Sequence, residues 1–192
     1  MKVLVTGGAR SGKSGFAEAY AAKLGAEGVY VATGQAYDEE MEQRIAMHRR
    51  EREASGFPWR TIEEPLALAE TLLHLQDEQA GGAAKDLRPV VLVDCLTLWL
   101  SNWSLRLETE PEAERRLEEK IAELAGVVTG YPGLLLLVTN EVGYGLVPEY
   151  KLGRRFRDLS GRMNQRLARS ADQVILVTSG IPVELSRIRF QF

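Results

Sequence analysis

The chain has little of what marks secreted, membrane-spanning or nucleic-acid-binding proteins. Its single cysteine, Cys95, excludes a disulfide within the chain and is typical of a reducing compartment. No apolar run reaches the length of about eighteen residues that a membrane-spanning helix needs. The net charge of −3 gives no overall positive field to attract nucleic acid or an anionic membrane. We therefore expect a cytoplasmic protein without a signal peptide, a membrane span or a nucleic-acid partner.

What the chain does have is enough apolar sequence for a sizeable core. Hydrophobic residues make up 45% and charged residues 27% of its 192 residues, which is ordinary for a globular protein. At this length we expect one domain over residues 1–192. Short, continuous apolar runs are typical of strands buried on both faces of a parallel sheet. The strands predicted in this way are 3–5, 29–32, 90–93, 134–138 and 174–177.

Helical periodicity fills the intervals between these runs. The helices predicted from it are 13–24, 38–54, 66–78, 111–129 and 152–170. The alternation predicts an α/β fold with a mostly parallel central sheet flanked by helices. Residues 181–192 hold no helical stripe, and there we expect an antiparallel edge strand. We expect residues 79–89, which contain two adjacent glycines, to form a flexible surface loop.

Between the first predicted strand and the first predicted helix lies a glycine-rich segment, GGARSGKS. It matches the phosphate-binding loop G-x-x-x-x-G-K-[ST] in the strand-loop-helix context that this loop requires. Its glycines let backbone N–H groups point at a polyphosphate, and the helix N-terminus adds its positive dipole. Lys13 can reach the β- and γ-phosphates, and the Ser14 hydroxyl can bind Mg²⁺.

The alternative is a glycine-rich surface turn, but the context favours a P-loop NTPase-like fold that binds a nucleoside triphosphate. The loop residues that we expect to contact the nucleotide are Gly7, Gly8, Ala9, Arg10, Ser11, Gly12, Lys13 and Ser14.

A second nucleotide signal is the carboxylate that ends the predicted strand 90–93. In a phosphate-loop fold, an acid at this point binds Mg²⁺ directly or through water. Many buried strands end in Asp only because the following turn favours it. Together with Lys13 and Ser14, however, we interpret Asp94 as a second magnesium ligand.

The predicted strand 134–138 is also followed by polar residues, Asn140 and Glu141. They reach the carboxyl edge of the sheet, where α/β proteins bind their ligands. The pattern alone does not separate a role in ligand binding from simple loop capping.

Of the two histidines in the chain, His48 lies in an arginine-rich helical stretch. Arg44, His48 and Arg52 share one face at i, i+4 and i+8, which could hold a phosphate while the imidazole attacks it. Spacing leaves two alternatives open: His48 borders the core next to Ile45, or it lies on a solvated basic helix. We interpret His74, in an amphipathic helix, as structural.

A series of segments resembles one known family nearly end to end. The segments are 5–14 (VTGGARSGKS), 30–35 (YVATGQ), 44–49 (RIAMHR), 59–65 (WRTIEEP), 94–100 (DCLTLWL), 139–148 (TNEVGYGLVP) and 156–165 (FRDLSGRMNQ). Their order resembles the bifunctional adenosylcobinamide kinase / adenosylcobinamide-phosphate guanylyltransferase family of cobalamin biosynthesis. The phosphate loop is generic, whereas the N-E-V-G-x-G and G-R-x-N-Q stretches are particular. The chain departs from the family pattern by a small insertion between Arg52 and Trp59.

The resemblance implies two reactions at one nucleotide site. First, a nucleoside triphosphate, ATP or GTP, phosphorylates the aminopropanol hydroxyl of adenosylcobinamide. Second, GTP guanylylates a histidine and releases pyrophosphate, and the phosphorylated cobinamide takes the GMP to give adenosylcobinamide-GDP. The family histidine falls on His48, while Lys13 stabilises phosphate charge. Mg²⁺ and a homotrimer are also implied.

The resemblance also assigns contacts outside the phosphate loop. Asp94 fits the acid that binds the metal, and Glu141 supports metal or cobinamide chemistry. The further nucleotide contacts that it implies are Ala32, Thr33, Gly34, Arg49, Arg50, Glu51, Arg52 and Glu63.

Two other functions remain compatible with the phosphate loop. One is a kinase of another small metabolite, in which His48 is structural. The other is a nucleotide-dependent switch or binding module, whose output is conformational. Neither would carry label from the α-phosphate of GTP on His48. An ATPase stimulated by nucleic acid is disfavoured, because the arginines cluster on one helix without interleaved aromatic residues.

Overall fold

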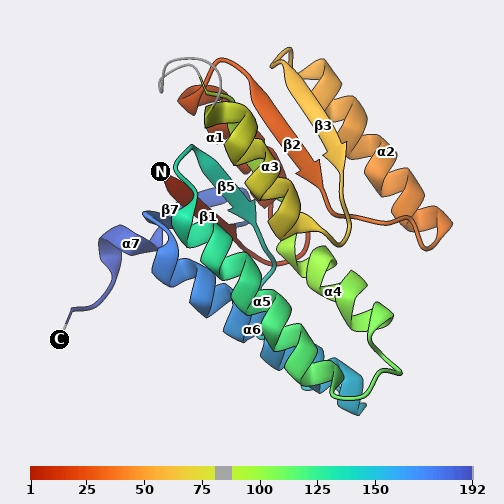
Figure 1. Cartoon of the computed structure of the whole chain (residues 1–192). Helices are drawn as coiled ribbons and strands as arrows, with labels where there is room; N and C mark the ends of the chain where they lie inside the picture. The colour runs from red at the N-terminus through yellow and green to blue at the C-terminus, as the bar shows by residue number, and fades with distance from the viewer. Residues whose placement is uncertain (81–87, 192) are drawn as a thin grey trace.

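The computed structural model describes residues 1–80 and 88–191 (Figure 1). Most of the loop expected at 79–89 therefore lies outside the described residues. The strands are β1 (Lys2–Thr6), β2 (Gly28–Ala32), β3 (Trp59–Glu63), β4 (Val90–Asp94), β5 (Leu135–Val138), β6 (Gln173–Thr178) and β7 (Ile181–Glu184). The helices are α1 (Lys13–Leu24), α2 (Glu39–Ala54), α3 (Leu68–Ala80), α4 (Leu96–Arg106), α5 (Ala113–Gly130), α6 (Lys151–Ser170) and α7 (Leu185–Ile188).

The strands form one seven-stranded sheet in the order β3-β2-β4-β5-β1-β6-β7. All neighbouring pairs are parallel except β6 and β7, which are antiparallel. The predicted α/β fold with a mostly parallel sheet and an antiparallel edge strand is confirmed. Of the expected range 181–192, however, the strand covers Ile181–Glu184, and α7 follows it. A tight turn joins β6 to β7. Both of its central residues, Ser179 and Gly180, have positive φ, as a type I′ hairpin turn requires.

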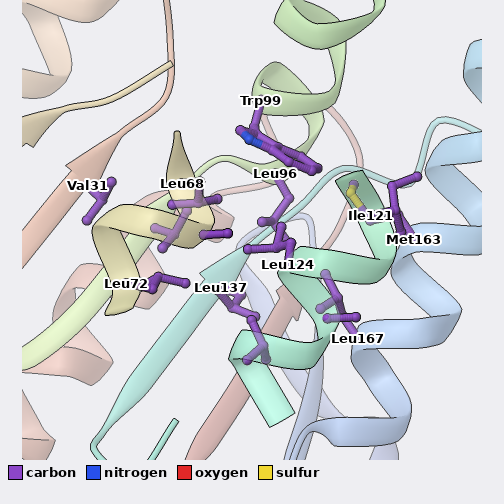
Figure 2. Close-up of a cluster of buried hydrophobic side chains, with 14 of the residues drawn as sticks. Val31, Leu68, Leu72, Leu96, Trp99, Ile121, Leu124, Leu137, Met163 and Leu167 are labelled. Carbon is purple, nitrogen blue, oxygen red and sulfur yellow. The ribbon is translucent and has the colours of Figure 1, made fainter. Parts of the chain in front are cut away.

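The sheet is covered on both faces, which explains its continuous apolar strands. Along β1, Val3 and Val5 join a cluster with residues of α1, whereas Leu4 joins the opposite cluster. Successive side chains of a strand point to opposite faces, so both kinds of position must be apolar. The larger cluster takes in residues of α3, α4, α5 and α6. Figure 2 shows part of it, with Leu72 of α3 and Leu124 of α5 among the labelled side chains.

The sequence did not predict β3 or α4. β3 is an edge strand of the sheet, and its residues Arg60 and Thr61 are exposed, so it has no continuous apolar run. α4 is apolar on several sides, so its sequence shows no separate apolar stripe at helical spacing. Its N-cap is Cys95, an unusual residue there, whose sulfur accepts a hydrogen bond from the Leu98 amide at 3.4 Å. Across residues 1–80 and 88–191, no helix has both the length and the apolar character to cross a membrane.

α2 differs from the other long helices in its surroundings. It lies beyond the edge strand β3 (Figure 1), and its only buried residue is Arg52. Its start is well defined, because the Asp38 side chain caps it by accepting from the Met41 amide at 2.8 Å. The helix over 38–54 was predicted from the sequence, and the structure confirms it within one residue.

Candidate active site

The phosphate loop joins β1 to α1 and depends on two of its glycines. A Cβ on Gly7 would meet the Val177 carbonyl oxygen at 2.3 Å, which no side chain could avoid. Gly12 has φ 90°, a left-handed conformation that favours glycine. The turn between β6 and β7 supports the loop, because the Gly180 amide donates to the Ser11 carbonyl at 2.9 Å. The loop is therefore held by the sheet itself.

Lys13 follows the loop, and its side chain is buried. Its Nζ donates to the Gly8 carbonyl oxygen at 3.1 Å. Burial lowers the pKa of Lys13, and the nearby Asp94 carboxylate opposes this effect. An ammonium group that has lost water in this way gains most from an anionic partner, such as a polyphosphate.

A cavity of about 650 Å³ opens beside the loop. It brings together predicted site residues from α1, β2, α2, β3 and β4. Those that line it are Lys13, Ser14, Ala32, Gly34, His48, Arg49, Arg52, Glu63 and Asp94. Arg44, which we placed on the face of His48, also lines it, as do Tyr30 and Asn140.

Other predicted contacts do not line the cavity. The phosphate-loop residues Gly7, Gly8, Ala9, Arg10, Ser11 and Gly12 lie beside it, and Arg50 and Glu51 are exposed on α2. Thr33 is fully buried, and its hydroxyl accepts from the Cys95 amide at 2.8 Å and donates to the Cys95 carbonyl at 2.6 Å. Thr33 therefore ties β2 to β4 below the site.

Asp94 and Ser14 both face the cavity, from the end of β4 and the start of α1. The Tyr30 hydroxyl donates to Oδ2 of Asp94 at 3.1 Å. Carboxylate and hydroxyl oxygens are the hard donors that Mg²⁺ prefers, and it usually completes its shell with phosphate oxygens and water. Within the described ranges, no group of three or more His, Cys, Asp or Glu side chains forms a metal site. The two residues fit a magnesium ion bound with its nucleotide.

The thiol beside Asp94 is not activated as a nucleophile. Cys95 is only 4% exposed, and burial raises its pKa to about 12. The thiolate is the nucleophilic form of cysteine, so this side chain is inert near neutral pH.

The sheet order shows where Asn140 and Glu141 lie, although their roles stay open. β5 lies between β1 and β4, so the segment after it emerges between the phosphate loop and Asp94. Oε1 of Glu141 accepts from the Thr6 hydroxyl at 2.6 Å, and its amide donates to the Gly7 carbonyl at 3.1 Å. Glu141 therefore touches the base of the loop.

His48 stands on α2 with about a third of its side chain exposed. Its Nδ1 lies 3.2 Å from Oε2 of Glu51, one turn further along the helix. Arg49 of the same helix pairs with Glu63, at the end of β3. The structure thus places His48 at the wall of the cavity, whereas His74 is exposed on α3.

α4, which the sequence did not predict, holds the loops that follow β2 and β3. Asn102 donates from Nδ2 to the Thr33 carbonyl at 2.8 Å and to the Pro65 carbonyl at 3.0 Å. The Trp99 and Trp103 indoles both donate to the Leu66 carbonyl. Trp99 is 1% exposed and belongs to the hydrophobic core.

A buried polar network supports the segment after β5. The Thr139 hydroxyl donates to Asn164 at 2.7 Å, and Asn164 donates to the Asn140 carbonyl at 3.2 Å. Thr97 of α4 accepts from the Asn140 amide at 2.8 Å. The sequence alone marked Asn164 only as part of the family segment 156–165, because no local pattern predicts hydrogen bonds to residues that are distant along the chain.

A family model described as cobinamide kinase / cobinamide phosphate guanyltransferase matches residues 3–185. The chain belongs to this family. It is an enzyme of the transferase class with kinase and nucleotidyltransferase relatives in cobalamin biosynthesis, as the sequence predicted.

Curated relatives support the assignment over nearly the whole chain. The bifunctional adenosylcobalamin biosynthesis protein CobP of Pseudomonas aeruginosa is 44% identical over 96% of this chain and 97% of its own length. The proteins named CobU of Salmonella typhimurium and Escherichia coli are 42% and 40% identical, each over 96% of this chain and 99% of their own length. The residues matched by the family model, 3–185, include both the phosphate loop and the histidine-bearing helix.

Proposed function

We propose that this enzyme phosphorylates adenosylcobinamide with a nucleoside triphosphate and then transfers GMP from GTP to the product through His48. The observation that carries the proposal is that Lys13 and His48 line one cavity, although they come from different elements. A kinase alone needs only the phosphate loop. A nucleophile across the cavity from that loop adds a second reaction at the same nucleotide.

The first reaction moves the γ-phosphoryl group. The aminopropanol hydroxyl attacks the γ-phosphorus, the bond to the β,γ-bridging oxygen breaks, and the hydroxyl proton is released. Lys13 and the amides of the phosphate loop stabilise the charge on the departing nucleoside diphosphate. When bound, Mg²⁺ held by Ser14 and Asp94 would neutralise part of the phosphate charge.

The second reaction uses the imidazole of His48. With its proton on Nδ1, beside the Glu51 carboxylate, the ring keeps a free electron pair on Nε2. Nε2 attacks the α-phosphorus of GTP, and the bond to the α,β-bridging oxygen breaks, which releases pyrophosphate. A phosphate oxygen of the phosphorylated cobinamide then attacks the same phosphorus, and the P–N bond breaks. The product is adenosylcobinamide-GDP, and His48 is restored.

Label transfer tests the proposal directly. The enzyme is incubated with Mg²⁺ and GTP labelled at the α- or the γ-phosphate, denatured, and analysed for bound label. We expect acid-labile α-label on the wild type and none on His48→Ala. His74→Ala is the matched control, because it removes the other histidine from an exposed position on α3. It should retain the label.

The same experiment separates the other functions. A wild-type enzyme that binds GTP but retains no α-label would refute the histidine mechanism. Phosphorylation of an added small metabolite without α-label would then favour a simple kinase. Slow hydrolysis without any acceptor would favour a switch.

The homotrimer and the cytoplasmic location remain part of the proposal. Sedimentation of the purified enzyme tests the first, and fractionation of cells that produce it tests the second.

A further inference from the structure

Arg52 is an unusual residue for the helix that carries it. It is 6% exposed, whereas the other residues of α2 are half-buried or exposed. A buried guanidinium needs compensation for the water that it loses. The ring of Tyr30 provides part of it, because the Arg52 guanidinium carbon lies 3.6 Å from the ring centroid. This distance is well within the range of a cation–π interaction.

Tyr30 is itself fixed in the sheet. It lies at the centre of β2, is 4% exposed, and donates its hydroxyl to Asp94 of the neighbouring strand. Its ring also meets Trp59 of β3 edge-on, with centroids 5.8 Å apart. Burial, and then the Asp94 carboxylate, raise the pKa of Tyr30 well above its usual value, so the hydroxyl stays protonated.

The remaining ties of α2 to the sheet are weak. Arg49 pairs with Glu63, but both side chains are more than half exposed, and such pairs contribute little. Within residues 1–80 and 88–191, no element's backbone runs close to α2 along its length. Arg52 lies one turn after His48, and its Nη1 is 3.5 Å from the His48 carbonyl oxygen. Whatever holds Arg52 therefore also holds the histidine.

We propose that Tyr30 is a positioning residue whose aromatic ring packs against Arg52 and thereby holds the His48-bearing helix at the wall of the cavity beside the phosphate loop. The inference deepens the proposed function and rests on it. Tyr30 does not take part in bond making. Its ring fixes the position of α2 and in this way affects the rate of guanylyl transfer to His48.

Two substitutions separate the ring from the hydroxyl. Tyr30→Leu removes both, whereas Tyr30→Phe keeps the ring and loses only the bond to Asp94. Tyr20 offers matched controls, because it lies on α1, stacks on Phe16 and donates its hydroxyl to Gln173, away from the cavity. Tyr20→Leu and Tyr20→Phe therefore remove the same atoms elsewhere.

The first readout is the single-turnover rate at which α-label from saturating GTP reaches His48. We expect Tyr30→Leu to lower it about tenfold, since a partly buried cation–π contact contributes about 1–2 kcal/mol. The dissociation constant of GTP should change by less than the rate does, because Lys13 and the rest of the phosphate loop are intact. Tyr30→Phe should restore most of the rate. A purely structural role would instead lower affinity and rate together.

A double variant tests independently whether Tyr30 acts through Arg52. Arg52→Met combined with Tyr30→Leu should be no slower than the more impaired of the two single variants, because residues in one contact are not additive. Fully multiplied effects would show that the two side chains act separately and would overturn the proposal.

The second readout does not depend on guanylyl transfer. Amide hydrogen exchange over residues 39–54 should accelerate in Tyr30→Leu but not in Tyr30→Phe or Tyr20→Leu. If the wild type takes no α-label, the proposed function fails, yet this exchange pattern still decides whether the ring holds α2. Equal exchange and equal rates in Tyr30→Leu and Tyr30→Phe would overturn the inference.

Discussion

The two halves of the candidate site are built in opposite ways. The phosphate-loop half grows from β1 and β4, whose residues are buried on both faces of the sheet, and its lysine is buried with them. The histidine half is a polar helix beside the edge strand β3, with Arg52 as its one buried residue. One half is fixed by the hydrophobic core, and the other is fixed by a few polar and aromatic contacts.

This difference separates stability from chemistry. In the loop half, backbone geometry and close packing hold the groups that we expect to bind phosphate, so core changes there should disturb folding as well as binding. In the helix half, little apolar area is buried, so substitutions alter the place of His48 with small effects on global unfolding. In the proposed mechanism, polar contacts rather than the core would set the distance between His48 and the nucleotide.

Lys13→Met should have the largest effect on the chemistry. Loss of one positioned group that stabilises developing phosphate charge lowers rates by about 10²–10³-fold. Methionine has a similar length and releases the cost of a buried ammonium, so the midpoint of thermal unfolding should move by less than about 4 °C. Turnover of GTP and a thermal scan measure the two quantities. Lys23→Met, on the exposed side of the same helix, should be close to wild type in both.

Leu137→Ala should have the largest effect on stability. Leu137 is 1% exposed in the middle of β5, and truncation of a core leucine costs about 2–5 kcal/mol of unfolding free energy. Met47→Ala removes an apolar side chain that is 51% exposed on α2, and we expect a change within about 0.5 kcal/mol. Urea unfolding compares them. Similar losses in both variants would show that α2 is packed as firmly as the sheet.

The same contrast explains which elements the sequence could predict. Strands buried on both faces produce continuous apolar runs, and all the runs interpreted in this way are strands of the sheet. β3 was not predicted because it is an edge strand with exposed polar residues, and its position is set by pairing with β2. α4 was not predicted because it is apolar on several sides, so no separate polar face marks the helical period.

For the site, local motifs were predictable and long-range partners were not. The glycines, Lys13 and Ser14 form one contiguous segment whose chemistry follows from spacing. Glu141 contacts the base of the phosphate loop because β5 lies between β1 and β4, and no local sequence pattern predicts that strand order. Tyr30 reads only as one more apolar residue of its strand, although it contacts residues 22 and 64 positions further along the chain.

Asp38→Ala should have a moderate effect that stays local. Loss of an N-cap costs about 0.5–2 kcal/mol, and here the cap bond to Met41 would be lost at the free end of α2. We expect faster amide exchange in the first turns of α2, with little change in the midpoint of global unfolding. Asp77→Ala, at an exposed position on α3, is the matched control. Slower global refolding or a large drop in the midpoint would instead tie α2 to the core.

Glu18→Gln should change stability by an amount that depends on pH. Burial raises the pKa of Glu18 from 4.5 to about 7; Arg52 opposes the shift, while Asp94 and Glu51 add to it. Between these two values the folded state binds more protons than the unfolded state, so the wild type loses stability as the pH rises through this range. Above it, the difference stays constant.

Glutamine cannot ionise, so the variant escapes this loss. The stability of Glu18→Gln relative to wild type should therefore be higher at about pH 8 than at about pH 5, as measured by urea unfolding at both values. Glu70→Gln, an exposed glutamate on α3, serves as the control and should follow the wild-type curve. Parallel curves for Glu18→Gln and wild type would mean that Arg52 already neutralises Glu18. In that case the guanidinium would be shared between Tyr30 and a carboxylate, and α2 would be held to α1 as well as to the sheet.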